Sequence, residues 1–204
     1  RRGLLLAPPN LPGWDRVDVL GPLRAATGAP AALQNDANAG ALAEWRWGAG
    51  RGADSMIFLT FGTGMGAGLI LGGRLYAGAS DSAGEVGHVR LADWGPAGYG
   101  KPGSFEGFCS GGGIAQLGRL AAEAAMQRGA PPAWCPSRAA MAELSAETIA
   151  RAANGGDQLA LDLFSTVARR LGQGLALLVD ILNPELIVLG SIYTRQRSLI
   201  EPAM

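Results

Sequence analysis

The chain has 204 residues with 17 basic and 17 acidic side chains, so its formal net charge is zero. The chain has neither an excess of positive charge nor a basic run, so its composition does not support binding to nucleic acid or to an acidic membrane surface. Hydrophobic residues make up 48% of the chain, which is typical of a globular protein. No apolar run reaches the roughly 18 residues that span a bilayer, and the N-terminus lacks a signal-peptide pattern, so we expect a cytoplasmic protein.

Helix and strand patterns alternate along the chain and predict an α/β fold. Residues 31–33 form a short strand candidate, and Asn35 or Asp36 then stands where a helix N-cap is expected. The alanine-rich stretch that follows favours helix up to Gly48. Trp45 and Trp47 lie two apart on this helix and face different ways, so we expect one of them in the core.

The second half of the chain reads mainly as helix. Ser110 can cap a helix that runs to about Arg128, a short helix ends at Gly155 and Gly156, and residues 157–182 have the apolar spacing of a long packing helix. After the break at residues 183–184, a buried strand is expected at 186–189. Cys109 and Cys135 lack metal or disulfide spacing, and we expect Cys109 to pack as a small hydrophobe.

A glycine-rich segment follows the strand expected at residues 56–61. Gly62, Gly64, Gly66 and Gly68 alternate with other residues, and such a turn can permit positive φ and bring backbone N–H groups and the Thr63 hydroxyl close to a phosphate. A plain β-hairpin is the alternative, because residues 69–71, 72–73 and 74–76 also read as strand, turn and strand. The segment is neither a Walker loop nor a Rossmann fingerprint.

Several polar residues have a structural and a functional interpretation. Asp36 is either a helix cap or a general base beside Asn35, which would bind the same substrate. Glu85 and the chain's single histidine, His88, are three apart and lie on one side of a turn. Glu106 by itself would be a surface charge. Together these groups can donate to and accept from several hydroxyls, which suits a sugar.

At this point the chain resembles the ROK family (repressor, open reading frame, kinase) of the superfamily that contains sugar kinases, hexokinase, Hsp70 and actin. Six segments match in the family's order and cover nearly the whole chain: PNLPGW, NDANAGALAE, GTGMGAGLILGG, AGEVGH, SFEGFCSGGGIA and NPELIVLGS. The resemblance implies a ribonuclease H-like or actin-like ATPase fold, mainly its larger C-terminal lobe, with residues 1–204 as a ROK-type sugar kinase core.

The resemblance also implies roles for individual residues. Asp36 matches the catalytic base that deprotonates the sugar hydroxyl attacking the γ-phosphate of ATP. Sugar contacts are implied for Asn10, Asn35, Asp36, Glu85, His88 and Glu106. Nucleotide contacts are implied for Gly62, Thr63 and Gly64 at the phosphates and for Gly112 and Gly190 at the adenosine. Magnesium would accompany the ATP.

One departure from the family concerns zinc. Many ROK proteins bind a structural zinc through the histidine of this motif and three cysteines that precede the glutamate. Aligned on Glu106, those positions hold Ala97, Tyr99 and Ser104. One imidazole cannot supply a closed tetrahedral site, so we expect no structural zinc.

A second departure concerns the N-terminal lobe. The family's first phosphate motif has no match in this sequence, and Arg1 lies downstream of where it would be, so we expect that lobe to be largely missing. Two functions then remain open. One is ATP-dependent phosphorylation of a hexose or N-acetylhexosamine, and the other is a sugar-sensing transcriptional regulator without kinase activity, whose DNA-binding part would lie outside this segment. A homodimer is expected in either case.

Overall fold

The structure is a computed structural model that describes residues 3–5, 8 and 11–204. The chain divides into two compact units, residues 1–36 and 37–204, and each unit is described by itself. In the smaller unit, strands β1 (Leu4–Leu5) and β2 (Val17–Asp18) pair antiparallel. Helix α1 (Leu20–Thr27) follows and ends at Gly28, which has a φ of 65° and supplies the left-handed cap.

The strand expected at residues 31–33 is absent, which corrects the sequence prediction. A strand needs a neighbour to satisfy its backbone N–H and C=O groups, and among the described residues none pairs with this segment. The Ala31 carbonyl instead accepts from the Arg24 guanidinium at 2.7 Å. The helix that follows is confirmed as α2 (Asp36–Trp47), with Asp36 as its first residue.

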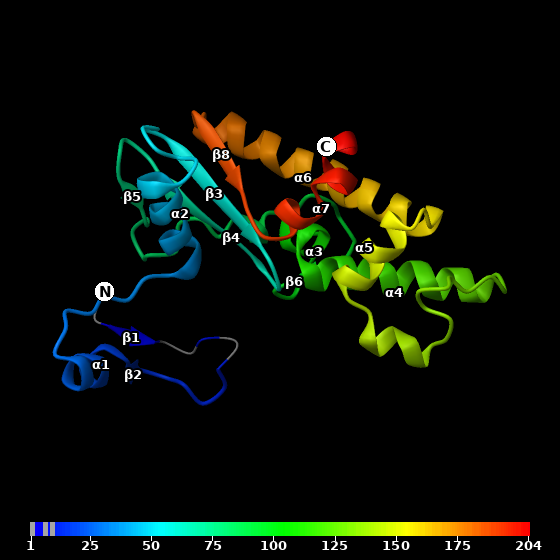
Figure 1. Ribbon diagram of the computed structural model, residues 1–204, viewed down its shortest axis with the longest axis horizontal. Helices are drawn as coiled ribbons and strands as arrows, with labels where there is room; N and C mark the ends of the chain where they lie inside the picture. Colours follow the sequence, from blue (N-terminus) through cyan, green and yellow to red (C-terminus); the bar gives the residue numbers. More distant parts are fainter. Residues whose placement is uncertain (1–2, 6–7, 9–10) are drawn as a thin grey trace. The chain divides into compact units, whose positions relative to one another are not determined.

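The larger unit contains a four-stranded sheet in the order β5-β4-β3-β8 (Figure 1). Strands β3 (Met56–Phe61), β4 (Met65–Ile70) and β5 (Leu75–Tyr76) form an antiparallel meander, and β8 (Leu186–Leu189) pairs parallel with β3. The predicted turn between β4 and β5 is confirmed, because Gly72 and Gly73 have φ angles of 59° and 66°. Such a pair suits the tight turn of a hairpin.

The two faces of the sheet pack against different helices. Along β3 the side chains alternate, so Ile57, Leu59 and Phe61 enter the main core, while Met56 packs with Ala41 of α2 on the opposite face. The main core is completed by α3 (Phe105–Cys109), α4 (Gly111–Gln127), α5 (Ala146–Asn154) and the long α6 (Gln158–Leu182). The sheet is therefore covered by α2 on one side and by α3 and α6 on the other.

Two of the alternating glycines allow α2 to lie directly on β4. A Cβ added to Gly68 would stand 2.5 Å from the Ala37 carbonyl oxygen, and one added to Gly66 would stand 3.2 Å from the Ala37 Cβ. The contact at Gly68 leaves no room for a side chain and requires glycine, whereas the contact at Gly66 is tight but less severe. Gly66 and Gly68 thus support the plain hairpin interpretation, whereas Gly62 and Gly64 lie in the turn before them.

Side-chain hydrogen bonds cap several helices of the larger unit, and they confirm the predicted cap at Ser110. Ser110 accepts from the Gly113 N–H at 3.1 Å, Ser145 from the Thr148 N–H at 3.2 Å, and Asp157 from the Ala160 N–H at 2.9 Å. The left-handed Asn183 ends α6. The short helix α3 is not among the predicted elements.

Two predictions about burial have different outcomes. Cys109 is fully buried in the main core, as expected for a small hydrophobe, and burial raises the pKa of its thiol. Strand β8 is only half-buried, although its apolar run predicts full burial. It is the last strand of the described sheet, so one of its edges has no strand beside it.

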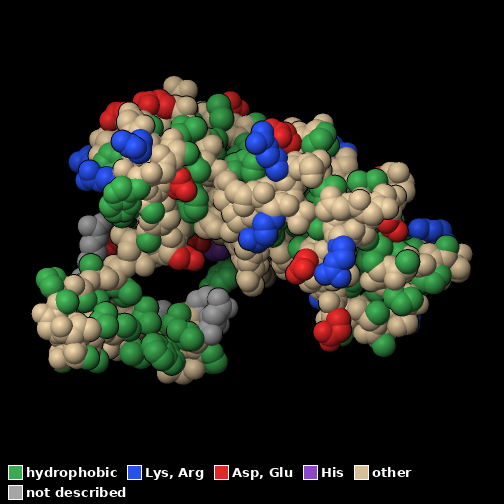
Figure 2. Space-filling model, viewed as in Figure 1, with side chains coloured by type: hydrophobic (Ala, Val, Ile, Leu, Met, Phe, Trp, Pro, Cys, Tyr) green, Lys and Arg blue, Asp and Glu red, His purple; other side chains and the backbone are tan. Residues whose placement is uncertain are grey.

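The remaining short elements complete the larger unit. They are the antiparallel pair β6 (Ala97–Gly98) and β7 (Lys101–Pro102), the 3-10 helices Val86–His88, Ala139–Glu143 and Glu201–Ala203, and α7 (Ile192–Ile200). Charges of both signs are interspersed on the face of this unit seen in Figure 2. Across the described residues, the helices are too short or too polar to cross a membrane.

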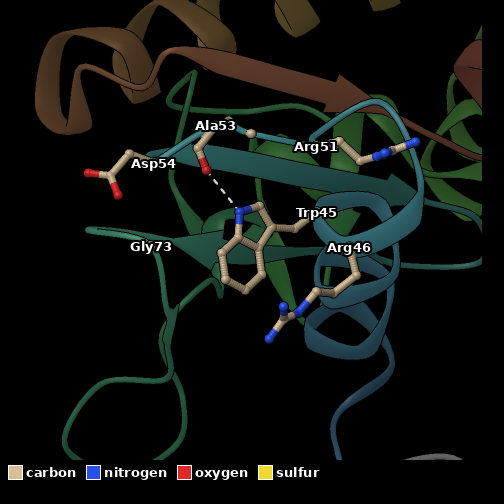
Figure 3. A pocket seen from close by; sticks show the side chains of 7 residues that line it. Trp45, Arg46, Arg51, Ala53, Asp54 and Gly73 are labelled. Carbon is tan, nitrogen blue, oxygen red and sulfur yellow. Dashed lines mark hydrogen bonds between the residues drawn. The ribbon is translucent and has the colours of Figure 1, made fainter.

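The two tryptophans of α2 lie in different surroundings. The Trp45 indole N–H donates to the Ala53 carbonyl at 2.8 Å, and the Arg46 guanidinium lies 4.8 Å from its ring centroid. Figure 3 shows the indole between these two groups, in a surface cavity of about 370 Å³ just before the start of β3. Trp47 is 80% exposed, whereas Trp45 is half-buried against the cluster of Ala41, Met56 and Ile70. The two side chains therefore face different ways as expected, but Trp45 packs at the edge of the core and not within it.

Replacing Trp45 by Phe is expected to lower the free energy of unfolding by about 1 kcal/mol, because the hydrogen bond to Ala53 is lost while a ring remains. Urea unfolding followed by circular dichroism measures the change. Trp47→Phe is the matched control and is expected to stay within about 0.5 kcal/mol of the parent. Equal losses in both variants would contradict the packing described for Trp45.

Candidate active site

The turn between β3 and β4 borders a cavity of the second unit that is larger than the one beside Trp45. This cavity has a volume of about 850 Å³ and is named here the α4–α7 cleft. Its lining comprises Gly62, Thr63, Gly111, Gly112, Ala115, Arg119, residues 144–147, Ile192, Arg195 and Gln196. Three of the glycine-segment and helix positions expected at a nucleotide, Gly62, Thr63 and Gly112, therefore lie together on one wall.

The turn is fixed to the start of α4. The Gly111 N–H donates to the Gly62 carbonyl at 2.7 Å, and a Cβ on Gly112 would be 3.5 Å from the Thr63 carbonyl oxygen. Ser110 caps this 17-residue helix, whose N-terminal end carries a partial positive charge. The wall of the cleft near Thr63 thus combines small residues, backbone N–H groups and a favourable dipole for an anionic group.

The conformation of the turn differs from the sequence expectation in one respect. Gly62 and Gly64 do not have positive φ angles, so glycine is not required there for a left-handed backbone. A Cβ on Gly62 would touch only the Ser191 hydroxyl, at 3.9 Å, whereas one on Gly64 would approach the Glu106 carboxylate at 3.0 Å. The missing side chains instead leave the backbone open to close approach.

Several residues of the cleft belong to no sequence motif that predicts a binding site. Arg119 donates to the Met141 and Leu144 carbonyls at 2.9 and 3.3 Å and so holds the segment before α5 against α4. The polar side chains of Glu147, Arg195 and Gln196 line the remainder of the cleft. The exposed turns of α5 and α7 that carry them look like ordinary solvated helix faces, and only the tertiary structure brings them together.

Glu106 connects α3 to the hairpin. Its Oε2 accepts the Met65 N–H at 2.9 Å, at the first residue of β4. The expectation for an isolated glutamate in a glycine-rich segment was a surface charge, but this side chain is half-buried and hydrogen-bonded. A carboxylate has acceptor sites for further hydrogen bonds, so it can hold the hairpin and still bind a hydroxyl group.

The AGEVGH segment lies beside the same residue of β4. The Gly84 carbonyl accepts from the Ala67 N–H at 2.9 Å, and a Cβ on Gly87 would be 2.9 Å from the Met65 carbonyl oxygen. Glu85 and His88 flank the 3-10 helix with 3.7 Å between Oε2 and Nε2, which confirms that they share one side of a turn. The expected sugar contacts Glu85, His88 and Glu106 thus come from segments that converge on the start of β4.

The three positions where the resemblance would place zinc-binding cysteines, Ala97, Tyr99 and Ser104, make other contacts here. The Ala97 backbone pairs with the Gln116 side-chain amide through bonds of 3.0 and 2.8 Å. Ser104 is fully buried, and its Oγ accepts the N–H groups of Gly98 and Gly107 at 3.2 and 3.1 Å. The Tyr99 ring stacks on the His88 ring with centroids 5.0 Å apart.

These groups do not fit a zinc ion. Ala97 offers no side-chain ligand, and the Ser104 hydroxyl oxygen is committed to two backbone donors. Across the part of the chain that the structure describes, no three histidine, cysteine or acidic side chains form a group that could hold a metal. The loop around β6 and β7 is instead held by an amide pair, a buried hydroxyl and an aromatic stack.

The remaining expected site residues are Asn10, Asn35, Asp36 and Gly190. Asn10 lies outside the described residues. Asn35 and Asp36 end the smaller unit, and Asp36 begins α2. Gly190 donates its N–H to the Leu59 carbonyl at 2.9 Å and precedes α7, but it does not line the cleft.

This sheet, with helices on both faces and a cleft beside the turn between its first two strands, is that of the actin-like ATPase fold. A ROK family glucokinase from Streptomyces griseus, solved in complex with glucose and AMPPNP, matches with a TM-score of 0.79 and 31% identity. That match covers 99% of this chain and 66% of the glucokinase. The α/β, actin-like class expected from the sequence is confirmed.

The model of the ROK family matches residues 1–204, and the chain belongs to this family. A glucokinase of Halalkalibacterium halodurans is 35% identical over 185 residues, which are 87% of this chain and 53% of that protein. A putative xylose repressor of Caldicellulosiruptor sp. is 31% identical over 197 residues, which are 93% of this chain and 46% of the repressor. The chain spans about half the length of these two relatives.

Replacing Glu106 by Ala is expected to lower the free energy of unfolding by about 2 kcal/mol, because the Met65 N–H loses a charged acceptor. Glu106→Gln retains an oxygen acceptor and is expected to lose less than about 1 kcal/mol. Urea unfolding measures both, with the exposed Glu147→Ala as control. Equal losses for Ala and Gln would rule out the hydrogen bond as the cause.

Removal of metal ions is expected to leave the melting temperature unchanged, because amide, hydroxyl and ring contacts hold the loop around β6 and β7. Scanning calorimetry with and without EDTA and 1,10-phenanthroline tests this. Gln116→Ala should lower the melting temperature by about 2 to 6 °C, since two hydrogen bonds to Ala97 are lost. The exposed Gln158→Ala serves as control, and a chelator-induced fall in the parent protein would contradict this account.

Proposed function

We propose that this chain contributes the nucleotide-phosphate wall and the sugar contacts of an enzyme that phosphorylates a hexose or an N-acetylhexosamine with ATP. One observation carries the proposal. The Gly62–Gly64 turn borders the α4–α7 cleft, while Met65, the next residue, is bound by Glu106 and lies beside the segment that carries Glu85 and His88. A cleft large enough for a nucleotide and a group of side chains able to bind hydroxyls therefore adjoin one hairpin.

The nucleotide half of the proposal rests on the cleft. Gly62, Thr63 and Gly64 would bring backbone N–H groups to the distal phosphates of ATP, and Gly112 and Gly190 would lie toward its adenosine. The cleft volume of about 850 Å³ is sufficient for a nucleotide. The related Streptomyces griseus structure holds glucose and AMPPNP, which supports this choice of ligands.

The sugar half assigns one role to each polar side chain. Asn10, Asn35, Glu85, His88 and Glu106 would hydrogen-bond the ring hydroxyls or an N-acetyl group, as carboxylates accept and neutral imidazole both donates and accepts.

Asp36 would take the proton from the attacking hydroxyl as its oxygen bonds to the γ-phosphorus, while the bond from that phosphorus to the β–γ bridging oxygen breaks and ADP leaves. Fixing the two reactants in line supplies most of the rate enhancement in such a reaction.

Magnesium fits this site only together with the nucleotide. Since the described histidine, cysteine and acidic side chains form no group of three, the ion would be held mainly by the ATP phosphates and water. When bound, Mg²⁺ neutralises the charge on the β and γ oxygens. The residues of the chain position the phosphates and the sugar around it.

A sugar-sensing regulator without kinase activity is the second candidate. The putative xylose repressor of Caldicellulosiruptor sp. is nearly as similar to this chain as the glucokinases are. The hydroxyl-binding residues would serve either function, whereas the Gly62–Gly64 turn and the cleft beside it are needed only for a nucleotide. This difference favours the kinase.

The first experiment measures ADP release from Mg-ATP with a panel of hexoses and N-acetylhexosamines. Asp36→Asn is expected to lower sugar-dependent turnover by about 10²- to 10⁴-fold, because the general base is lost while the size of the side chain is kept. Binding of the sugar, measured by calorimetry, should change far less.

Asp54→Asn is the matched control, since Asp54 precedes β3 and so lies at the end of that strand opposite the Gly62–Gly64 turn. It is expected to retain full turnover. Sugar binding without any ADP release in the parent chain would favour the regulator. Turnover that survives in Asp36→Asn would remove Asp36 from the role of base.

A further inference from the structure

The turn between β8 and α7 contains a strained residue. Ser191 has φ 56° and ψ −116°, a backbone conformation that normally requires glycine. The residue stands at the N-cap position of α7, yet its side chain makes no capping hydrogen bond to that helix. The hydroxyl is therefore directed away from its own helix.

Three hydrogen bonds hold Ser191 in this conformation. The Gly190 N–H donates to the Leu59 carbonyl at 2.9 Å, and the Thr194 hydroxyl donates to the Ser191 carbonyl at 2.8 Å. The Ser191 Oγ lies 3.1 Å from the Thr60 Oγ1. Strained backbone persists where its surroundings fix it in this way, and such residues cluster at functional sites.

The Ser191 hydroxyl lies next to Gly62, which lines the α4–α7 cleft, although Ser191 itself is not part of that lining. It would be the nearest atom to a Cβ on Gly62, at 3.9 Å, and the following residue, Ile192, lines the cleft together with Gly62 and Thr63. A glycine at position 62 leaves this hydroxyl uncovered on that side. The strain thus coincides with access to the wall proposed for the distal phosphates.

The hydroxyls of Thr60 and Ser191 share one hydrogen bond, which uses only one of their two protons. Thr60 and Ser191 stand at the carboxyl ends of the neighbouring parallel strands β3 and β8, where ligands of open α/β sheets bind. When Thr60 donates to Ser191, the Ser191 proton remains available for another acceptor. A phosphate oxygen in the cleft provides a charged acceptor, which makes the strongest kind of hydrogen bond for a hydroxyl.

We propose that Ser191 binds the nucleotide through its hydroxyl, which donates to a phosphate oxygen and is oriented by Thr60. The inference rests on the proposed function and adds to it a phosphate-binding residue outside the glycine-rich segment. The alternative is purely structural, namely that the hydroxyl pair only ties α7 to β3.

Two substitutions separate the hydroxyl from the strain. Ser191→Ala removes the hydroxyl and keeps the strained backbone, whereas Ser191→Gly removes the hydroxyl and relieves the strain. Both are expected to weaken Mg-AMPPNP binding about tenfold, as expected for loss of a hydrogen bond to a charged group. Ser191→Gly is expected to melt about 2 to 4 °C above Ser191→Ala. Calorimetric titration and thermal unfolding measure the two effects.

Two comparisons test the contact with phosphate directly. Adenosine, which has no phosphate, should bind the parent and both Ser191 variants equally. Thr60→Val breaks the hydroxyl pair and leaves the Ser191 hydroxyl in place, so its Mg-AMPPNP affinity should fall by less than threefold. If the hydroxyl pair only connected α7 to β3, Thr60→Val and Ser191→Ala would lower the Mg-AMPPNP affinity by the same factor. The affinity for adenosine would then fall by that factor as well.

The outcomes distinguish this inference from the proposed function. If the parent chain does not bind Mg-AMPPNP, the proposed function and the Ser191 contact fail together. If the parent binds and the Ser191 variants stay within twofold of it, only the Ser191 contact is wrong. A selective loss of Mg-AMPPNP affinity in both Ser191 variants supports it.

Discussion

The hydrogen bond from the Met65 N–H to the Glu106 carboxylate is the contact on which the rest of the site depends. It joins the end of the Gly62–Gly64 turn to the first turn of α3. Because the Gly111 N–H bonds back to Gly62, the turn is held from two helices that follow each other in the chain. A loop held at both ends can keep its backbone N–H groups in place without closing around a ligand, which lowers the cost of binding.

The elements that were predictable from the sequence are those determined by local physics. Strand β3, the glycine turn between β4 and β5, the Ser110 cap and the long α6 follow from apolar patterning, turn and capping chemistry and helical spacing. The wrong strand at residues 31–33 and the overestimated burial of β8 share one cause, since both depend on which strands lie alongside. Pairing of distant segments leaves no trace in a short window of sequence.

The candidate site was predictable where a motif concentrates its residues and not where the fold assembles them. Glu85 and His88 lie on one side of a turn because they are three apart, and Gly62, Thr63 and Gly112 meet on one wall. Arg195 and Gln196 lie some 80 residues further on, and nothing in their neighbours suggests a ligand. Even the glycine pattern combines two functions, because Gly66 and Gly68 serve the contact with α2.

The contacts that hold the loop around β6 and β7 have a consequence for the conditions under which the site keeps its shape. A zinc site made by thiolates opens when the metal is scarce or when the sulfurs are oxidised. Here the corresponding positions rely on the Gln116 amide, the Ser104 hydroxyl and the Tyr99 ring, none of which responds to either stress. The Cys109 thiol, on the last residue of α3, is buried in the main core, and burial raises its pKa. The shape of the loop that lies beside His88 and Glu106 is thereby uncoupled from zinc supply and from the redox state of its surroundings.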